Sequence, residues 1–594
     1  MPALLKNRDE TISLLQDIAR ILELKGESVF KVRAYTNGAR TLETFTGDFE
    51  ELIASQSLSN LPGMGDALTD KITTFVTTGS LPYFDELKRS VPEGLFDLFE
   101  LQGLGPKKIK TLWEQLNITT LESLETAAKD GSIAALKGFG TKTASNLLES
   151  IEAHKRYAHS YRFNQIAPLA EHLREQLREL DEVIQVEIAG SYRRRKEIVR
   201  DVDFIVSSNT PEPVMAFFTS HPQVESILVQ GPTKSSVRLK IGIQADLRVV
   251  SNTQFPFALN YFTGSKEHNI LIRQRALDKG WTLNEYRLAQ DPKQPDAPLP
   301  PENISTEADL YRALGLDFIE PELREATGEV EAAETHSLPR LVELTNIRGT
   351  FHCHTTASDG RSSLREMVDA ALDHGLQYLG ISDHSRSSVK ARGLSESQLL
   401  EQVAAIRQLN TELAPDFRIF TGVECDILKD GSLDYPDEIL AQLDYIVASV
   451  HNAFEMNESA MTDRIIRALE NPHVTMLGHL SGRLLLSREA YALDIPRVID
   501  SAARTGTWIE LNGNGRRLDM DWRFWPLAKR KGVRCVINPD AHHVTQFQNL
   551  SFGTNIARKG GLTKADVMNC LPLAQMEIAL QQKRKQSGIA PPLP

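Results

Sequence analysis

Apolar residues recur at helical spacing through the first part of the chain, up to about His159. The segment from Met1 to Arg20 has the pattern of an amphipathic helix, and a similar pattern appears at Ala144, Leu147 and Ile151. Helical side chains three and four positions apart share a face, so these residues would form one apolar stripe on each helix. The sequence therefore predicts a mainly helical N-terminal region.

The middle of the chain, roughly Tyr161 to Arg324, mixes strand and helix patterns. The short apolar runs Phe204–Val206 and Leu247–Val250 are typical of strands. We therefore expect a region of mixed α/β structure here.

Short apolar strands alternate with helical stretches in the last part of the chain, from about Asn346 onward. The seven expected strands lie near Ile347–Phe351, Tyr378–Ile381, Ile419–Val423, Tyr445–Val450, Val474–Leu477, Trp508–Leu511 and Cys535–Ile537. Strands that alternate with helices are typical of a parallel α/β sheet or barrel.

A strong acidic bias lies between the middle and last regions. From Pro301 to Thr345 there are eleven Asp or Glu residues and three Arg residues. Such a bias is typical of a solvated segment, so we expect an exposed connection that is partly helical. The proline-rich stretch before it, Asp291 to Pro301, predicts a surface loop.

The length of 594 residues predicts several domains, because single hydrophobic cores stop growing well below that size. No stretch is apolar enough to cross a bilayer, and the N-terminus has no basic region followed by an apolar run. We therefore expect no membrane contact and no secretory signal. Cys353, Cys425, Cys535 and Cys570 form no CxxC pair, which predicts a reduced cytoplasmic location without structural disulfides.

The formal charge of −12 argues against a protein that coats nucleic acid by bulk attraction. It leaves room for local basic patches, and two groups stand out. Arg193–Lys196 is a run of four basic residues, and Lys107, Lys108 and Lys110 form a second group. Each group is either a binding patch or an ordinary solvated surface, and its charge alone does not separate these readings.

Three similar glycine turns lie in the helical N-terminal region. They read Leu61-Pro62-Gly63-Met64-Gly65, Leu101-Gln102-Gly103-Leu104-Gly105 and Leu136-Lys137-Gly138-Phe139-Gly140. A Gly-x-Gly turn before a helix presents free backbone N–H groups at the positive end of the helix dipole, where a phosphate binds. One such turn is usually only a turn, but three together favour sequence-independent binding of a nucleic-acid backbone.

Three aspartates in the middle region suggest a metal site. Asp201 and Asp203 are two positions apart on an expected strand, so their side chains share a face. Asp246, on another expected strand, could complete the set. Carboxylates gathered on one face repel each other unless a cation lies between them, and hard oxygen ligands favour Mg²⁺. Two such ions would activate a hydroxyl and stabilise a leaving phosphate. A solvent-facing acidic pair is the alternative.

Histidines are concentrated toward the end of the chain, where ten of the fifteen lie from His336 onward. Most of them, with several carboxylates, follow the expected strands. The candidate ligands are His352, His354, Asp359, His384, Glu424, His451, His479, Asp540 and His542. Residues at the carboxyl ends of barrel strands meet in one place, so these side chains predict a multinuclear metal site. Mixed imidazole and carboxylate ligands suit Zn²⁺, Mn²⁺ or Fe, and the sequence does not choose among them. We leave His374, His473 and His543 out of the site.

The residues around the aspartates resemble the nucleotidyltransferase signature of family X DNA polymerases. Gly190-Ser191-Tyr192-Arg193-Arg194 precedes the aspartate pair at a spacing that resembles the family's. The resemblance implies that Asp201, Asp203 and Asp246 are catalytic ligands of Mg²⁺ or Mn²⁺. It also implies that Gly190 and Ser191 offer donors to the triphosphate of a dNTP and that Arg194 neutralises it.

A second motif of the same family follows. Tyr261-Phe262-Thr263-Gly264-Ser265 is similar to the family's segment at the sugar-binding edge of the nucleotide. Asn269 and Arg273 follow at family spacing, which implies contacts with the incoming base or the template minor groove. The sequence departs from the animal polymerase beta pattern at Val199, Arg200, Gln244 and Lys266, which leaves the three acids intact but bears on fidelity and nucleotide affinity.

The glycine turns resemble helix-hairpin-helix motifs, which implies that Gly63, Gly65, Gly103, Gly105, Gly138 and Gly140 lie against DNA. The first motif, with Glu27 to Tyr35 before it, resembles the lyase-type domain of DNA polymerase beta. Lys71 lies where such domains carry a Schiff-base lysine, so it is a candidate nucleophile toward an abasic sugar. The alternative is a lysine that contacts phosphate or solvent, and the absence of a second lysine at Ala67 favours this alternative.

The histidine pattern resembles the polymerase and histidinol phosphatase (PHP) domain, a (β/α)7 barrel with three divalent metals. The whole chain resembles bacterial family X polymerases that carry this domain at the C-terminus. The resemblance implies six parts: residues 1–80, a helix-hairpin-helix lyase-type domain; 81–160, a second helix-hairpin-helix subdomain; 161–250, a nucleotidyltransferase palm; 251–324, a thumb; 325–345, an acidic linker; and 346–580, a PHP phosphoesterase domain.

The function implied is a DNA polymerase that fills short gaps in base excision repair. Its PHP domain would act as a 3′-5′ exonuclease, an abasic-site endonuclease or a 3′-phosphatase, and the sequence does not choose among these. We expect gapped or primed duplex DNA as the partner and a monomer. Two other functions remain open: a DNA-binding scaffold with an inactive polymerase site, and a small-molecule phosphatase similar to histidinol phosphatase.

Overall fold

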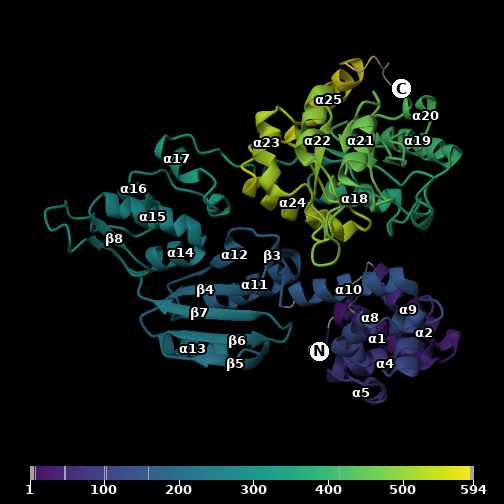
Figure 1. The fold of residues 1–594 in the computed structure, drawn as a ribbon, viewed down its shortest axis with the longest axis horizontal. Coiled ribbons are helices and arrows are strands. Elements are labelled where there is room, and N and C mark those ends of the chain that lie inside the picture. Colours follow the sequence, from purple (N-terminus) through teal and green to yellow (C-terminus); the bar gives the residue numbers. More distant parts are fainter. Residues whose placement is uncertain are drawn as a thin grey trace. The chain divides into compact units, whose positions relative to one another are not determined.

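The computed structural model describes residues 6, 8–45, 49–99, 101, 103–157, 159–413, 415–586 and 588. The chain divides into two compact units, Met1–Ala158 and His159–Pro594, which are described separately (Figure 1).

The first unit is helical among its described residues, as the apolar spacing predicted. Its main helices are α1 (Arg8–Lys25), α2 (Val29–Thr44), α3 (Phe49–Ala54), α4 (Asp66–Thr78), α5 (Pro82–Arg89), α6 (Leu95–Phe99), α7 (Pro106–Leu116), α8 (Leu121–Lys129), α9 (Ser132–Ala135) and α10 (Gly140–Tyr157). The helix expected over Met1–Arg20 begins at Arg8 in the structure, and residues 1–5 and 7 lie outside the described residues. The apolar stripes of these helices meet in one buried cluster, which includes Leu15, Ile72, Leu112 and Ile151.

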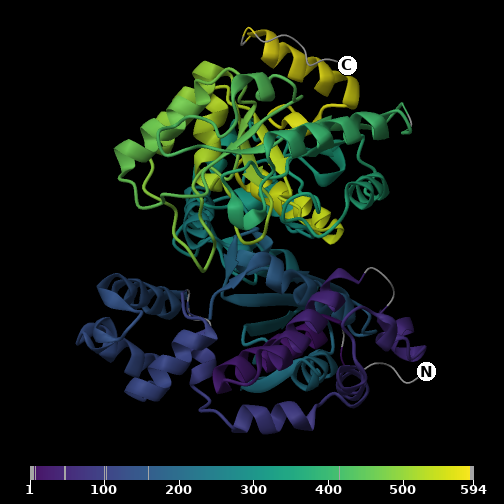
Figure 2. The ribbon, with the colours of Figure 1, turned by 90° about the vertical axis from the view of Figure 1, so that its right-hand side faces the viewer.

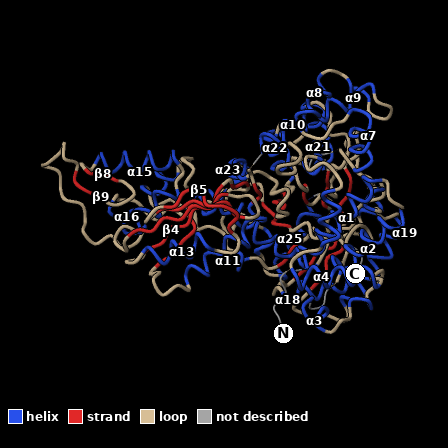
Figure 3. The backbone as a smooth tube through the Cα atoms, turned by 90° about the horizontal axis from the view of Figure 1, so that it is seen from below, coloured by secondary structure: helices blue, strands red, loops and turns tan. Residues whose placement is uncertain are grey.

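The second unit begins with a five-stranded sheet. Its strand order is β2 (Gln185–Ile188), β4 (Asp201–Ser207), β7 (Gln244–Val250), β6 (Lys234–Leu239) and β5 (Val224–Gln230), and β4 and β7 run parallel while the other pairs are antiparallel. Helices α11 (Phe163–Arg178) and α13 (Pro211–Ser220) pack on one face of this sheet (Figure 3).

Strict alternation along β4 assigns its side chains to the two faces of the sheet. Val202, Phe204 and Val206 join the core under α11 and α13, whereas Ile205 packs on the other face against helix α14 (Phe255–Thr263). Asp203 and Asp201 lie two and four positions before Ile205, so their side chains are on the same face as that of Ile205. The sheet therefore presents its aspartates on the face opposite its main core.

A smaller helical part follows the sheet. It contains α14, α15 (Lys266–Asp278), the hairpin β8 (Trp281–Leu283) and β9 (Leu288–Gln290), α16 (Glu307–Ala313) and α17 (Glu329–Glu334). Leu310, Tyr311 and Ala333 are buried in its core.

The prediction of an exposed acidic connection over Pro301–Thr345 is wrong for much of that segment. Glu307, Glu322, Arg324 and Glu329 are all buried. The Glu307 carboxylate accepts hydrogen bonds from Arg324 at 2.6 Å and from Arg193 at 2.5 Å, and Glu329 contacts His268 at 2.7 Å. Arg193 and His268 lie 114 and 61 positions away in sequence, so the acidic bias resembled a solvated surface although these acids are paired inside the fold.

The last part of the second unit alternates parallel strands with helices. The strands β10 (Gly349–Thr350), β11 (Tyr378–Ile381) and β12 (Arg418–Thr421) form one sheet, and β13 (Glu424–Asp426), β14 (Val447–Ser449), β15 (Met476–Leu477), β16 (Trp508–Asn512) and β17 (Cys535–Asn538) form the other. The intervening helices are α18 (Leu364–Asp373), α19 (Glu396–Asn410), α20 (Asp437–Leu440), α21 (Glu458–Leu469), α22 (Ile495–Thr505), α23 (Trp525–Arg530) and α24 (Asn549–Lys559). All seven expected strands are confirmed, and β13 continues the third of them.

The strand order agrees with the expected barrel. An isolated parallel bridge joins Cys353, after the first strand, to Ala541, after the last. Side chains from or beside all of these strands except β13, among them Phe351, Phe420 and Val536, meet in one buried cluster. The last helix, α25 (Leu573–Gln586), lies on the outside of this part (Figure 2). The closed barrel itself stays a prediction.

Candidate active sites

The nine ligands predicted in the last region form one cluster, and seven of them line one cavity. His352 and His354 follow β10, Glu424 begins β13, and the other members lie in the loops after neighbouring strands. The cavity has a volume of about 550 Å³, and its wall includes Asp359, His384, His451, His479 and His542. Parallel strands that end at the same edge bring these distant residues together.

Glu424 is the centre of the cluster. Its Oε1 atom lies 2.8 Å from His479 Nε2 and 3.1 Å from His451 Nε2. Its Oε2 atom lies 3.0 Å from His384 Nδ1, 3.3 Å from His352 Nε2 and 3.7 Å from His354 Nε2. A single buried carboxylate therefore faces five imidazoles.

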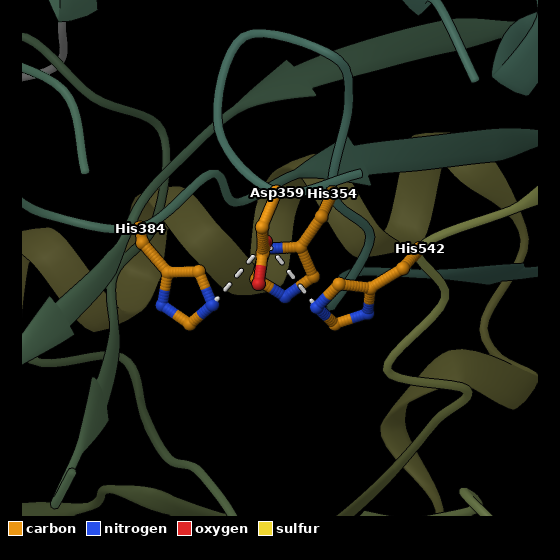
Figure 4. Close-up of side chains that lie close together, drawn as sticks. All are labelled: His354, Asp359, His384 and His542. Atoms are coloured by element: carbon orange, nitrogen blue, oxygen red, sulfur yellow. Dashed lines mark ion pairs between the residues drawn. The ribbon is translucent and has the colours of Figure 1, made fainter. Parts of the chain in front are cut away.

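Asp359 gathers a second set (Figure 4). Its Oδ1 atom lies 3.4 Å from His542 Nε2, 3.6 Å from His384 Nε2 and 3.9 Å from His354 Nδ1. Asp540 Oδ1 lies 3.5 Å from His354 Nε2, which links the two sets. The ligand atoms fall into three groups, and within each group all atoms lie within 4.8 Å of one another. The groups are His354, Asp359, His384 and His542; His352, His354 and Glu424; and His384, Glu424 and His451.

The imidazoles and carboxylates strongly perturb each other's pKa values. Burial opposes protonation of His451, but Glu424 and Asp426 outweigh it and raise its pKa to about 10. Burial and the neighbouring His542 and His384 lower the pKa of His354 to about 4. Burial alone would raise the pKa of Asp359, yet the surrounding imidazoles lower it to about 2.

Several ring nitrogens in this cluster are suited to hold cations. Within the part of the chain that the structure describes, His352 Nε2, both nitrogens of His354, His384 Nδ1 and His479 Nδ1 are buried without a hydrogen-bond partner. Buried polar atoms normally have such a partner, and imidazole nitrogens beside carboxylates are transition-metal ligands. The cluster therefore fits divalent metal ions.

Three neighbours of the cluster were not predicted. Glu510 Oε2 lies 2.6 Å from His352 Nδ1, and Asp426 Oδ1 lies 2.5 Å from His451 Nδ1, so both carboxylates orient a ligand ring. Arg517 Nε lies 3.3 Å from Asp540 Oδ2 at the cavity wall. The available signals were the position of Asp426 two residues after Glu424 and an acid inside the apolar run Trp508–Leu511.

The three aspartates of the middle region lie on two adjacent strands. Asp203 on β4 is paired in register with Asp246 on β7, and Asp201 is paired with Gln244. Gln244 donates a hydrogen bond of 3.0 Å to Asp246. This triad is not among the three groups of ligand atoms within 4.8 Å of one another found in the described residues.

The aspartates disfavour each other's ionised form. Burial, Asp201 and Asp246 together raise the pKa of Asp203 to about 7. Burial and Asp246 also raise the pKa of Asp201. An all-carboxylate set whose negative charges repel fits a hard divalent cation, which would relieve this repulsion.

Gly190 lets its own backbone lie close to the Asp203 carboxylate. It has a φ of +63°, and a Cβ at this position would lie 2.3 Å from Asp203 Oδ2. Only glycine combines this backbone conformation with so close a carboxylate. The first turn of α12 (Gly190–Arg193) therefore lies directly beside the aspartates.

The side chains predicted to contact a nucleotide line the same region but already have protein partners. Arg194 donates through Nε to Glu325 at 3.1 Å and through Nη1 to the Thr263 carbonyl. Asn269 donates to the Tyr261 carbonyl at 2.8 Å, and the Arg273 guanidinium lies 5.0 Å from the Tyr261 ring centre. Ser265 caps α15, because its hydroxyl accepts from His268 N.

The run Arg193–Lys196 is not a free basic patch. Arg193 pairs with Glu307, and Lys196 pairs with Glu325 at 3.2 Å. Arg195 lies over the Phe163 ring at 5.4 Å.

The glycine turns of the first unit lie at helix N-termini, as predicted. Gly65 and Gly105 are the N-cap residues of α4 and α7, and α10 begins at Gly140. A Cβ at Gly65, Gly103, Gly105, Gly138 or Gly140 would meet nothing within 4 Å, so these turns face open space. Gln102 of the second turn lies outside the described residues.

Lys71 lies on α4, partly exposed. Its ammonium donates to the Ala67 carbonyl at 3.2 Å and lies 5.0 Å from the Tyr83 ring centre. Neither contact is specific to a nucleophile, so its role as a lyase residue stays a prediction. All four cysteines are free, as the sequence predicted, and all four are buried. Among the described helices, none is both long and apolar enough to span a membrane.

Five family models match successive segments of the chain. They are the helix-hairpin-helix domain at residues 6–81, the SAM-like helix-hairpin-helix tandem at 96–153, the DNA polymerase beta palm at 164–235, the DNA polymerase beta thumb at 258–325 and the PHP domain at 350–512. The aspartate pair lies inside the palm match, and most of the imidazole cluster lies inside the PHP match.

Curated relatives resemble either the whole chain or its last part. The DNA polymerase/3′-5′ exonuclease PolX of Bacillus subtilis is 36% identical over 578 residues, which cover 97% of this chain and all of the relative. A protein of Thermoanaerobacter sp. named a probable phosphatase is 27% identical over 248 residues, 40% of this chain and 96% of the relative. A probable phosphatase of Acetivibrio thermocellus is 30% identical over 200 residues, 32% of this chain and 78% of the relative.

Proposed function

The chain belongs to the bacterial family X DNA polymerases that carry a C-terminal PHP domain, and we propose that it fills short gaps in DNA during repair. The observation that carries this proposal is the placement of Asp201, Asp203 and Asp246 on one face of adjacent strands beside Gly190. The proposed parts keep the boundaries expected from the sequence. The substrate we propose is gapped or primed duplex DNA, bound by a monomer.

The three aspartates would hold Mg²⁺ or Mn²⁺. When bound, such ions lower the pKa of an attacking hydroxyl and stabilise charge on the phosphate. The chain's own residues position the nucleotide: Gly190 and Ser191 offer donors at the start of α12, and Arg194 offers a guanidinium to the triphosphate. Tyr261, Phe262, Gly264, Ser265, Asn269 and Arg273 would line the sugar and base.

The PHP cluster would hydrolyse phosphoester bonds in DNA, first of all by removing 3′-terminal nucleotides. Its nine ligands would hold up to three Zn²⁺, Mn²⁺ or Fe ions, which supply an activated water. Glu510 and Asp426 keep the rings of His352 and His451 in place by hydrogen bonds to Nδ1. Abasic-site cleavage and removal of 3′-phosphates use the same chemistry and remain alternatives.

The open helix N-termini at the three glycine turns would contact DNA phosphates. Lys71 would act as a lyase nucleophile only if it captures an abasic sugar. Borohydride trapping on a 5′-incised abasic duplex tests this role, and equal trapping by Lys71→Ala would remove it.

The test of the proposed function is one labelled gapped duplex incubated with and without dNTPs in Mg²⁺ or Mn²⁺. We expect gap filling with dNTPs and stepwise shortening of the 3′ end without them. An inactive scaffold would bind the duplex and change neither end. A small-molecule phosphatase would leave the duplex intact and turn over histidinol phosphate.

A further inference from the structure

Helix α24 of the PHP part ends on a lysine whose ammonium lies inside the second unit. The Lys559 side chain has no exposed surface. Its Nζ donates to the Arg194 carbonyl at 3.0 Å, to the Glu322 carbonyl at 3.3 Å and to Glu325 Oε1 at 2.6 Å. It also lies 4.6 Å from the Trp522 ring centre. A cation of the PHP part is therefore anchored 365 positions away in sequence, on the palm.

Glu325 is the shared anion at this contact. Its Oε1 atom accepts from Lys559 and from Arg194 Nε at 3.1 Å, and its Oε2 atom lies 3.2 Å from Lys196 Nζ. The Glu325 side chain is only 10% exposed, so water screens these interactions weakly. One carboxylate thus divides its charge among two palm cations and one PHP cation.

Arg194 is held from two sides by this arrangement. Lys559 fixes its backbone carbonyl, and Glu325 fixes its guanidinium, which also donates to the Thr263 carbonyl. The Cβ that Gly264 lacks would lie 3.1 Å from Arg194 Nη1, so the guanidinium lies against the Thr263–Ser265 turn. Any triphosphate bound by Arg194 has to compete with Glu325 for this guanidinium.

We propose that Lys559 is a positioning residue for nucleotide addition. Its ammonium takes up part of the Glu325 charge and holds the Arg194 carbonyl, so the Arg194 guanidinium stays available to an incoming triphosphate. Without Lys559, Glu325 would bind Arg194 and Lys196 with its full charge. The nucleotide affinity of the palm thus depends on a side chain of the PHP part. This inference rests on the proposed role of Arg194 in triphosphate binding.

A neighbouring contact provides a matched control. Arg558, the preceding residue of α24, donates to Glu322 at 2.7 Å and to the Val342 carbonyl at 3.3 Å. It also lies 3.7 Å from Glu320 Oε2, so it joins α24 to the stretch Glu320–Val342, and none of its three partners contacts the Arg194 guanidinium. Arg558→Met therefore removes a comparable contact without changing the charge around Arg194.

The test is a dNTP titration of single-nucleotide gap filling by the full-length protein, with nucleotide binding measured at equilibrium. We expect Lys559→Met to raise KM and the dissociation constant for dNTP by roughly tenfold, the effect of one charge-assisted contact, with kcat changed less than about twofold. Adding Glu325→Gln should return both constants toward wild type, because the competing carboxylate is gone. Arg558→Met should leave both constants unchanged.

Each other outcome has a definite meaning. Should Lys559→Met fail to fold, Lys559→Gln keeps a donor for the Arg194 carbonyl, removes only the charge, and should give the same rise. An unchanged KM in the Lys559 variant, or a double variant no better than the single, overturns the inference. Arg194→Ala separates the triphosphate role of Arg194 from the positioning role of Lys559. If Arg194→Ala leaves KM unchanged, the triphosphate role of Arg194 fails as well. If it raises KM while the Lys559 variant does not, only the role of Lys559 fails.

Discussion

The two candidate sites of this molecule are built from opposite charge patterns. In the PHP cluster every carboxylate faces imidazoles, as Glu424 does with five rings, and the pKa of Asp359 falls to about 2. In the palm three carboxylates face each other across β4 and β7, and the pKa of Asp203 rises to about 7. The first cluster balances its own charge, whereas the second depends on an external cation.

This difference separates what holds each site together. The carboxylates and imidazoles of the PHP cluster attract one another, and this attraction favours the fold around them. The palm aspartates destabilise the fold when they are ionised, because their negative charges repel. A bound cation would relieve this repulsion, so the repulsion favours cation binding. Substitutions in the two sites should therefore have separate effects on catalysis and opposite effects on stability.

The largest expected effect is on nucleotide addition by Asp203→Ala. Loss of one of three metal ligands should remove several kcal/mol of transition-state stabilisation, about 1,000-fold or more in kcat/KM. Binding of gapped DNA should stay near wild type, because the glycine turns are untouched. Asp181→Ala, an exposed acid of the same part, is the control. Extension by Asp203→Ala at the wild-type rate would remove the aspartates from the reaction.

The next effect is the loss of hydrolysis in the double variant His352→Ala with His354→Ala. Both rings face Glu424, so the change should reduce 3′-end shortening by about 100-fold or more. His374→Ala, an exposed histidine at the end of α18, should leave it unchanged. Shortening that persists in the double variant would move hydrolysis out of the PHP cluster.

A smaller effect is expected from Asp426→Asn. The Asp426 carboxylate orients His451 and also accepts from Ser388 Oγ at 2.8 Å. Removing such a support typically costs about 10- to 100-fold in metal affinity or activity, and excess Mn²⁺ should recover part of the loss. Asp430→Asn, which changes only a local contact with Ser432, is the control. Equal hydrolysis by both variants at limiting Mn²⁺ would deny Asp426 this role.

The remaining predictions concern stability, measured in the presence of a chelator. The folded-state pKa of Asp203 is raised from 3.8 to about 7, so its ionisation destabilises the fold progressively from pH 3.8 to 7 and fully above pH 7. Asp203→Asn should therefore stabilise the protein at pH 8, by at most about 4 kcal/mol, and have little effect at pH 4.

Ionisation of Asp359 has the opposite effect on the stability of the fold. Its folded-state pKa is lowered to about 2, so it contributes stability above pH 3.8 that is lost as the pH falls toward 2. Asp359→Asn should therefore lower the midpoint of thermal unfolding at pH 8 in EDTA, where Asp203→Asn raises it. Shifts in the same direction would contradict the contrast between the two sites.

The sequence predicted the PHP ligands well because each one follows a buried parallel strand, which reads as a short apolar run. It missed β13, whose three residues are Glu424, Cys425 and Asp426 and form no such run. It also missed Glu510, which lies within a strand and contacts His352 only through the fold. An acid inside an apolar run is a weak signal, and it does not identify a partner that lies 158 positions away.

The prediction of an exposed acidic segment over Pro301–Thr345 failed because a local signal was present but misleading. Glu307, Glu325 and Glu329 looked solvated because their partners Arg193, Lys559 and His268 come from other parts of the chain. A local count of charges cannot distinguish a solvated acid from a paired one. The same pairing explains why the run Arg193–Lys196 is not an open basic surface.

The central claim is that polymerisation and hydrolysis belong to two chemically separable sites. The most direct measurement is one end-labelled gapped duplex given to wild type, Asp203→Ala and the His352→Ala/His354→Ala double variant, each with and without dNTPs. We predict that Asp203→Ala shortens but does not extend the primer, and that the histidine variant extends but does not shorten it. Loss of both activities in either variant, or shortening that vanishes with Asp203→Ala and persists in the histidine variant, would contradict the claim.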